Sequence, residues 1–242
     1  GSFPSARIAG LLAGGVDIRR HGSGNAGATN TLRILGKGWA AAVLCVDLAK
    51  GAAAVLLAGY LFPAAGDAVG AGSNVAAGSI AAGGSMAIAG SMAAGSGEAA
   101  AIAAAVTGGG QPAAMQLREA VRAGAGLLVV IGHVFPVFSA FRGGKGVATA
   151  AGMLTALFPP IAPACAAVFA IVLAVGKKAS LASLVTAILL PFLYAVLSYA
   201  VFSVFSCWLL GLCAIITVMV VYTHRANIRR LREGVEPDVG AA

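Results

Sequence analysis

Four long apolar runs constrain the fold of this chain more than any other feature. Each has roughly the 20 residues that an α-helix needs to cross the hydrocarbon core of a bilayer; they are residues 39–62, 122–141, 179–199 and 204–222. Only 10% of the residues are charged, whereas a soluble domain has about 25%. The sequence therefore excludes a soluble globular domain. It predicts an all-α, polytopic helix bundle in a lipid bilayer, formed by residues 1–242 as a single domain.

Prolines make the apolar segment 147–176 ambiguous. Pro159, Pro160 and Pro163 lie in its middle, and proline lacks the N–H that a helix interior needs. The segment is either one kinked span or two short spans. Two spans, unlike one, place all four clusters of basic residues on the same side of the membrane, as the positive-inside rule favours. The clusters are Arg19/Arg20/Arg33/Lys37, Arg142/Lys145, Lys177/Lys178 and Arg225/Arg229/Arg230/Arg232.

We therefore expect about seven transmembrane helices, with the N-terminus outside and the C-terminus in the cytoplasm. Residues 1–16 then correspond to the second part of a span that begins before them. The formal net charge of +8 suits anionic lipid headgroups, an anionic substrate or both. Residues 64–116 are almost entirely Ala, Gly and Ser and resemble a linker. We expect an inserted outer loop at about 64–120, with 116–122 as a short amphipathic helix; an extra helix pair at 77–106 is the alternative.

A glycine-rich polar string, GSGNAGATN, occupies residues 22–30 and is followed by Arg33. Glycines let backbone N–H groups converge on an anion, so Gly22, Ser23, Gly24 and Asn25 are candidates for binding one. The string also matches the dinucleotide fingerprint GxGxxG, but that motif requires a βαβ unit, which membrane spans do not provide. A merely flexible loop is the alternative.

A second string, FRGGKGVAT, covers residues 141–149 at the start of an expected helix. Gly143 and Gly144 expose backbone beside Lys145, and the helix N-terminus adds its positive end. A glycine turn with a lysine that reaches out to the headgroups is the alternative.

Two more polar groups complete the candidate site. Ser180 and Ser183 begin an expected helix and are, taken alone, typical of caps. His224 and Asn227 are three residues apart and share a helix face, at the start of a basic tail. The sequence thus predicts a donor-rich, carboxylate-poor pocket that opens to the cytoplasm, suited to a phosphate-bearing anion with an apolar part. His224 is the one obvious candidate for a general base.

Other polar residues in apolar runs have structural explanations. Asp47 and Lys50 are expected to pair, because an isolated charge in the bilayer is costly, and His133 is expected to be a hydrogen-bonded core residue. The four cysteines at 45, 165, 207 and 213 are expected to be small buried hydrophobes. Three histidines without a carboxylate cluster favour no metal site.

In their order along the chain and in their residues, these strings resemble the motifs of the bacterial acyl-phosphate-dependent glycerol-3-phosphate acyltransferases. The matching stretches are residues 1–4, 17–36, 47–51, 132–149, 180–183 and 224–231. The resemblance implies transfer of a fatty acyl group from acyl phosphate, and not from acyl-CoA, to the sn-1 hydroxyl of glycerol 3-phosphate. Lysophosphatidic acid and inorganic phosphate would be the products. It also implies the bacterial inner membrane, a monomer, no cofactor and no nucleic-acid partner.

The resemblance further implies the roles of individual residues. Glycerol 3-phosphate would be bound by Ser23, Arg33, Lys145, Ser183, His224 and Asn227, with Lys145, His224 and Ser23 as the catalytic group. The loops of Gly22, Gly24 and Asn25 and of Gly143 and Gly144 would hold the acyl-phosphate head, and the substrate phosphate would assist proton transfer. The main alternative is a transporter for a small phosphorylated or other anion, which would also place glycines and basic residues in the membrane. No convincing internal repeat supports that alternative.

Overall fold

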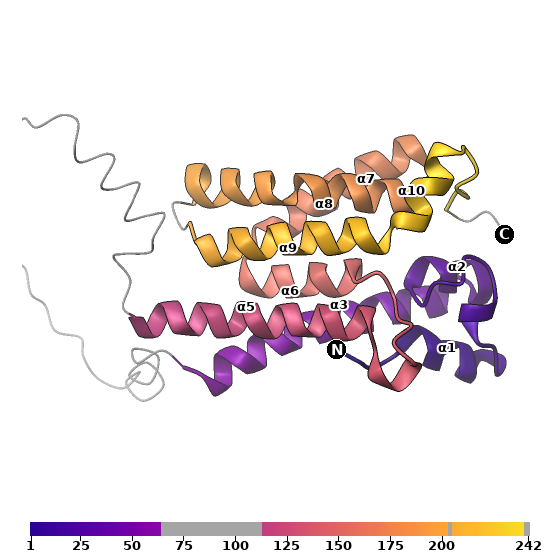
Figure 1. Ribbon diagram of the computed structural model, residues 1–242, viewed down its shortest axis with the longest axis horizontal. Coiled ribbons are helices and arrows are strands. Elements are labelled where there is room, and N and C mark those ends of the chain that lie inside the picture. The colour runs from indigo at the N-terminus through magenta and orange to yellow at the C-terminus, as the bar shows by residue number, and fades with distance from the viewer. Residues whose placement is uncertain (64–112, 203–204, 240–242) are drawn as a thin grey trace, which may run out of the picture.

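A computed structural model describes residues 1–63, 113–202 and 205–239, and the regular structure in these ranges is entirely helical. The longest helices run side by side and shorter ones gather at one end of the bundle (Figure 1). The predicted all-α class is confirmed for the described residues. The segment 64–112, which holds most of the expected insertion and the alternative helix pair, lies outside them.

Three helical segments are long and apolar enough to cross a membrane. They are Lys37–Leu61 (α3), Met115–Ser139, which comprises most of α5 (Ala113–Val134) and the short η3 (Val137–Ser139), and Ala179–Val201, which comprises α8 (Ala179–Ala195) and the π-helical η4 (Val196–Val201). The pair α9 (Cys207–Thr223) and α10 (Arg225–Arg232), bent by 60°, passes the same test when the two helices are taken as one span. These described helices support a membrane bundle, and the expected number of seven spans remains a prediction.

The proline-rich segment forms two helices, as predicted. α6 (Val147–Leu157) ends before Pro159, and α7 (Ile161–Gly176) begins after Pro160. Pro163 lies in the first turn of α7, where backbone N–H groups have no partner within the helix in any case. The alternative of one continuous kinked span is therefore wrong. The C-terminal carbonyls of α6 gain a partner from α5, because Arg122 Nη2 donates to the Ala156 oxygen over 2.9 Å.

All four basic clusters lie at one end of the bundle, together with α1 (Ser5–Gly14), η1 (Ile18–Arg20) and α2 (Ala28–Leu35) (Figure 1). Hydrogen bonds join the clusters through shared partners. Arg33 reaches the carbonyl oxygen of Asp238, and Lys178 reaches the carboxylate of the same residue. The predicted co-location of the clusters is thus confirmed, whereas their cytoplasmic side is a matter of topology that the helices alone do not fix.

Two expectations about the long helices need correction. Residues 116–122 do not form a separate amphipathic helix, since α5 runs without a break from Ala113 to Val134. The apolar run 122–141 is helical only in part, because the chain turns at Pro136. Among the cysteines, Cys213 is buried, but Cys45 and Cys207 are exposed. α9 is apolar on all sides, so its sequence does not show which face turns inward.

Small residues bring α3 and α6 close together. A Cβ atom on Gly51 of α3 would lie 2.1 Å from the backbone oxygen of Thr149, and one on Gly152 of α6 would lie 1.9 Å from that of Leu48. Such contacts between small residues are how helices pack in membranes, where lipid supplies little hydrophobic driving force. This crossing places the start of α6, and with it the second glycine string, beside α3.

Candidate active site

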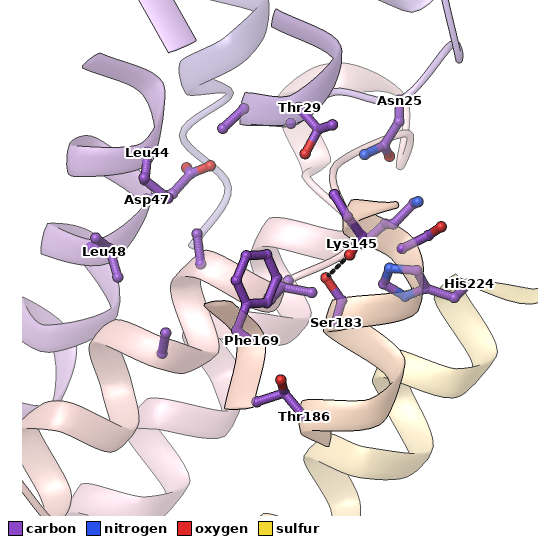
Figure 2. Close-up of a pocket in the computed structure, with 18 of the residues that line it drawn as sticks. Asn25, Thr29, Leu44, Asp47, Leu48, Lys145, Phe169, Ser183, Thr186 and His224 are labelled. Atoms are coloured by element: carbon purple, nitrogen blue, oxygen red, sulfur yellow. Dashed lines mark hydrogen bonds between the residues drawn. The ribbon is translucent and has the colours of Figure 1, made fainter. Parts of the chain in front are cut away.

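A cavity of about 520 Å³ opens at the basic end of the bundle. Its lining comes from both the N-terminal and the C-terminal halves of the chain (Figure 2). The polar side chains that line it are Ser23, Asn25, Thr29, Asn30, Arg33, Asp47, His133, Lys145, Thr155, Ser180, Ser183, Thr186, His224, Asn227 and Glu236. An apolar arm continues between the helices and is lined by Leu44, Leu48, Leu154, Ile161 and Phe169, among others. The cavity therefore suits a ligand with one polar and one apolar part.

The structure brings most of the predicted site residues together. Ser23, Asn25, Arg33, Lys145, Ser183, His224 and Asn227 all line this cavity. The four predicted glycines do not line it. The amides of three of them donate to backbone carbonyls: Gly24 to His21 (3.1 Å), Gly143 to Val134 (3.2 Å) and Gly144 to His133 (3.2 Å). In this structure these glycines shape the loops, and their contact with substrate stays a prediction.

The loop of residues 22–27 is held by a buried asparagine. Asn30 Oδ1 accepts from the amide of Ser23 (2.8 Å), and its Nδ2 donates to the carbonyls of Ile18 (2.9 Å) and His21 (3.1 Å). Gly22 has a positive φ of 61°, and a Cβ there would lie 2.4 Å from Asn30 Oδ1. These contacts anchor the loop on the cavity wall, and its role in binding an anion stays a prediction.

Lys145 lies in the loop of residues 142–146 and turns into the cavity. Its Nζ donates to Asn227 Oδ1 over 2.6 Å, and its backbone oxygen accepts from the Thr223 hydroxyl over 3.2 Å. Burial lowers the pKa of Lys145 to about 8, with the positive charges of Arg230 and Arg33 adding to the shift and the negative charge of Glu236 opposing it. The alternative of a lysine that points out to the headgroups is therefore wrong.

The serines at the start of α8 do not cap it. The N-cap position is Lys178, and no side chain caps that end. The Ser180 hydroxyl donates to Glu236 Oε1 (2.7 Å), and the Ser183 hydroxyl donates to the Ala179 oxygen (2.8 Å; Figure 2). The capping interpretation is therefore wrong, and because both serines line the cavity, a role in binding stays a prediction.

His224 stands at the bend between α9 and α10 and is only 2% exposed. Its Nδ1 lies 2.8 Å from the backbone oxygen of Val220. A carbonyl can only accept, so Nδ1 carries the proton and Nε2 keeps a free lone pair. Asn227 lies one turn further on and is also buried. The prediction that these two side chains serve the same site is consistent with their shared cavity.

Glu236 is the site residue that sequence reasoning missed. It is 6% exposed and accepts hydrogen bonds from Ser180 (2.7 Å), Asn227 Nδ2 (2.6 Å) and Arg230 Nε (2.7 Å). Burial alone would raise the pKa of Glu236, but these three donors outweigh it and lower the pKa. The chain reverses at Gly234, where φ is 71°. With Asp47 and Glu236 both in the lining, the expectation of a carboxylate-poor pocket is corrected.

The C-terminal segment 234–239 contributes Glu236 to the cavity wall and bonds to residues on either side of it. Arg33 Nη2 donates to the carbonyls of Pro237 (3.3 Å) and Asp238 (3.2 Å). Lys178 pairs with the Asp238 carboxylate over 2.7 Å, and the Val239 amide donates to the Lys177 oxygen. The first and last predicted polar groups are thus tied together through this segment.

The sequence as a whole matches one family of proteins. The family model described as glycerol-3-phosphate acyltransferase matches residues 1–116 and 96–234. The glycerol-3-phosphate acyltransferase of Gloeobacter violaceus is 35% identical over 244 residues, which cover 99% of this chain and 90% of the relative. The chain belongs to the glycerol-3-phosphate acyltransferase family.

Other members of this acyltransferase family are about as similar. The glycerol-3-phosphate acyltransferase of Chlorobaculum tepidum is 34% identical over 253 residues, covering 98% of this chain and 90% of the relative. Among solved structures, this chain resembles the glycerol 3-phosphate form of PlsY (YgiH), an integral membrane glycerol 3-phosphate acyltransferase. The TM-score is 0.65. The sequences are 28% identical, and the match covers 97% of this chain and 89% of that one. The form of PlsY with lysophosphatidic acid gives a TM-score of 0.63. Together with the apolar helices, this likeness identifies a membrane protein.

Proposed function

We propose that this chain transfers a fatty acyl group from acyl phosphate to the sn-1 hydroxyl of glycerol 3-phosphate, and that it releases lysophosphatidic acid and inorganic phosphate. The observation that carries the proposal is one cavity with a cationic, donor-rich end and an apolar arm. Family membership supports glycerol 3-phosphate as the acceptor, and a phosphate-bearing donor suits the same cationic end. We place the reaction in the bacterial inner membrane, with the cavity facing the cytoplasm.

The polar end has the groups needed for two anionic substrates. Lys145 and Arg33 supply positive charge, and the hydroxyls and amides of Ser23, Ser183 and Asn227 supply neutral donors. Charge-assisted hydrogen bonds to phosphate are roughly twice as strong as neutral ones. We propose a monomer as the working unit. The Ser183 hydroxyl bonds only to a backbone carbonyl of its own helix, so it remains available to accept or to rotate toward a ligand.

The apolar arm suits the acyl chain. Leu44 and Leu48 come from α3, Leu154 from α6, and Ile161 and Phe169 from α7. An acyl chain there would pack against side chains that are as apolar as the lipid it leaves. The carbonyl carbon would then lie where the arm meets the polar end, close to the acceptor hydroxyl.

The chemistry asks mainly for positioning. The glycerol oxygen forms a bond to the acyl carbon, the bond from that carbon to the phosphate oxygen breaks, and the hydroxyl proton leaves with the phosphate. Acyl phosphate is a mixed anhydride with a good leaving group, so alignment of the two substrates supplies much of the rate, up to roughly 7–11 kcal/mol of barrier. Lys145 would offset the repulsion between the anions and stabilise the developing oxyanion. The free Nε2 of His224 offers an additional place for the proton.

An acyl-transfer assay with two donors tests the proposal. Purified protein in detergent or lipidic phase would receive glycerol 3-phosphate with either palmitoyl phosphate or palmitoyl-CoA. Lysophosphatidic acid and phosphate from palmitoyl phosphate alone, with the acyl group at sn-1 by NMR, is the expected result. Product from palmitoyl-CoA would overturn the donor, and no product from folded protein would overturn the enzyme. Uptake of glycerol 3-phosphate by proteoliposomes would then test the transporter alternative.

A further inference from the structure

A second polar cluster lies on the cavity wall, and the proposed chemistry does not use it. Asp47 is 2% exposed and accepts hydrogen bonds from the Ser5 hydroxyl and from Lys50 Nζ, both over 2.6 Å. Lys50 Nζ also lies 2.5 Å from His133 Nδ1. The paired charges of Asp47 and Lys50 confirm the expected ion pair. Lys50 of this pair also contacts His133, which lines the cavity.

The contact with Lys50 fixes the state of the His133 ring. An ammonium group can only donate, so Nδ1 of His133 must accept and its proton must lie on Nε2. The ring is therefore neutral, with one defined orientation. No hydrogen-bond partner of Nε2 lies among the described residues.

The other edge of the ring lies against Gly144, which itself approaches the backbone of Ala26 in the 22–27 loop. A Cβ on Gly144 would lie 2.2 Å from His133 Nε2 and 2.7 Å from the backbone oxygen of Ala26. The ring thus packs where the 142–146 loop meets the 22–27 loop. His133 also holds the 142–146 loop through its backbone, since its carbonyl accepts a hydrogen bond from the Gly144 amide. Glycine at position 144 is what allows the ring to come so close.

We propose that His133 is a positioning residue, which holds the 22–27 and 142–146 loops in register at the cavity wall. Lys50 and Asp47 orient its ring. As a consequence, the side chain of Lys145, which follows Gly144, enters the cavity beside Asn227. Because this role rests on the proposed function, its test starts from a wild-type protein that transfers acyl groups.

The test compares variants that keep or break each part of the cluster. In His133→Asn the amide oxygen can replace Nδ1 as acceptor for Lys50, while the part of the ring against Gly144 is lost. In Asp47→Asn combined with Lys50→Met the buried charges disappear together, which avoids leaving one of them unpaired, but the ring loses its partner. Thr217→Val is the matched control, because it removes another interhelical hydrogen bond, the part-buried one from Thr217 to the Ala187 oxygen, and touches neither the cluster nor the loops.

The pH profile of kcat/KM separates positioning from folding. Protonated Lys145 is needed, so wild-type activity should fall as the pH rises through about 8. Arg33, Arg230, His224 and Glu236 also face Lys145, and none of them is altered in the variants. If the loop moves, Lys145 gains water and its pKa rises, so the alkaline fall moves to higher pH.

We expect both cluster variants to fold by thermal unfolding and to lose roughly a hundredfold in kcat/KM, the cost of a misplacement of about 1 Å, with the alkaline fall displaced upward. Thr217→Val should keep the wild-type profile. Wild-type kcat/KM and pH profile in His133→Asn would overturn the proposal. Full activity of the Asp47/Lys50 double variant would show an ion pair that only stabilises the fold. An inactive wild-type protein would instead overturn the proposed function.

Discussion

Two buried carboxylates flank the cavity, and the chain brings them there in different ways. Asp47 lies inside α3, where a serine hydroxyl and a lysine ammonium bond to it. Glu236 lies beyond α10, where a serine, an asparagine and an arginine bond to it. A carboxylate inside an apolar run must have a partner, so the sequence already indicates one. A carboxylate in a polar tail has no such requirement, and only the turn at Gly234 reveals its place.

The two clusters also reach Lys145 by different routes. Glu236 bonds to Asn227, which in turn accepts from Lys145, so it acts on the ammonium group itself. The Asp47 cluster reaches the same lysine through a ring that packs against its loop. Loss of the Glu236 side should therefore change substrate binding most, while loss of the Asp47 side should change alignment.

Removal of Lys145 should have the largest effect, because both clusters serve it. We expect Lys145→Ala to lower the rate of acyl transfer at least about a hundredfold, the scale of losing one oxyanion donor. Lys37→Ala is the matched control, since Lys37 is an exposed lysine outside the cavity. Initial rates with palmitoyl phosphate measure both. Near-normal turnover of Lys145→Ala would contradict its place in the site.

Loss of the Glu236 carboxylate should have an intermediate effect. Glu236→Ala leaves Ser180, Asn227 and Arg230 without their shared acceptor, so we expect the KM for glycerol 3-phosphate to rise roughly tenfold, the scale of a hydrogen bond to a charged group. Glu236→Gln keeps one acceptor oxygen and should lose less. A lower KM in Glu236→Ala would instead mean that the carboxylate competes with the substrate phosphate for these donors.

The smallest effect is expected at the outer end of the C-terminal segment. Asp238 pairs with Lys178, but about half of its side chain is exposed, and exposed pairs contribute little. Asp238→Asn should raise the KM for glycerol 3-phosphate by less than about fivefold. High salt, which screens exposed charges, should remove the difference from the wild type. A large loss of kcat would show that this pair holds Arg33 more firmly than its exposure indicates.

The sequence predicted those parts of the fold that follow from hydrophobicity and proline. The break at Pro159 and Pro160 and the gathering of the basic clusters at one end were correct for this reason. It failed for the cysteines, since exposed Cys45 and buried Cys213 both lie between apolar neighbours in sequence. It also failed at the N-terminal end of α5, where polar residues belong to the same helix as the apolar run that follows them.

For the site, the polar strings were predictable because such residues are costly in a membrane unless they are used. The roles of the individual residues within these strings were not predictable. Asn30 anchors its loop and Ser180 bonds to Glu236, although both residue types fit ligand binding or capping equally well. Contacts between segments more than 200 residues apart, such as that from Arg33 to Asp238, leave no local pattern to read.

Arg122 carries a consequence for how the protein enters the membrane. The helix α6 rises only about 16 Å, far less than the roughly 30 Å of the hydrocarbon core, so its last carbonyls end away from water. The Arg122 guanidinium caps one of them, and each group is costly in lipid without the other. We therefore expect α5 and α6 to leave the translocon as one unit. In Arg122→Ala, membrane insertion should fail, so that less folded protein is made whether or not catalysis is affected. An arginine inside a bundle is in this sense an assembly signal, and it should be discounted when charges are used to orient the chain.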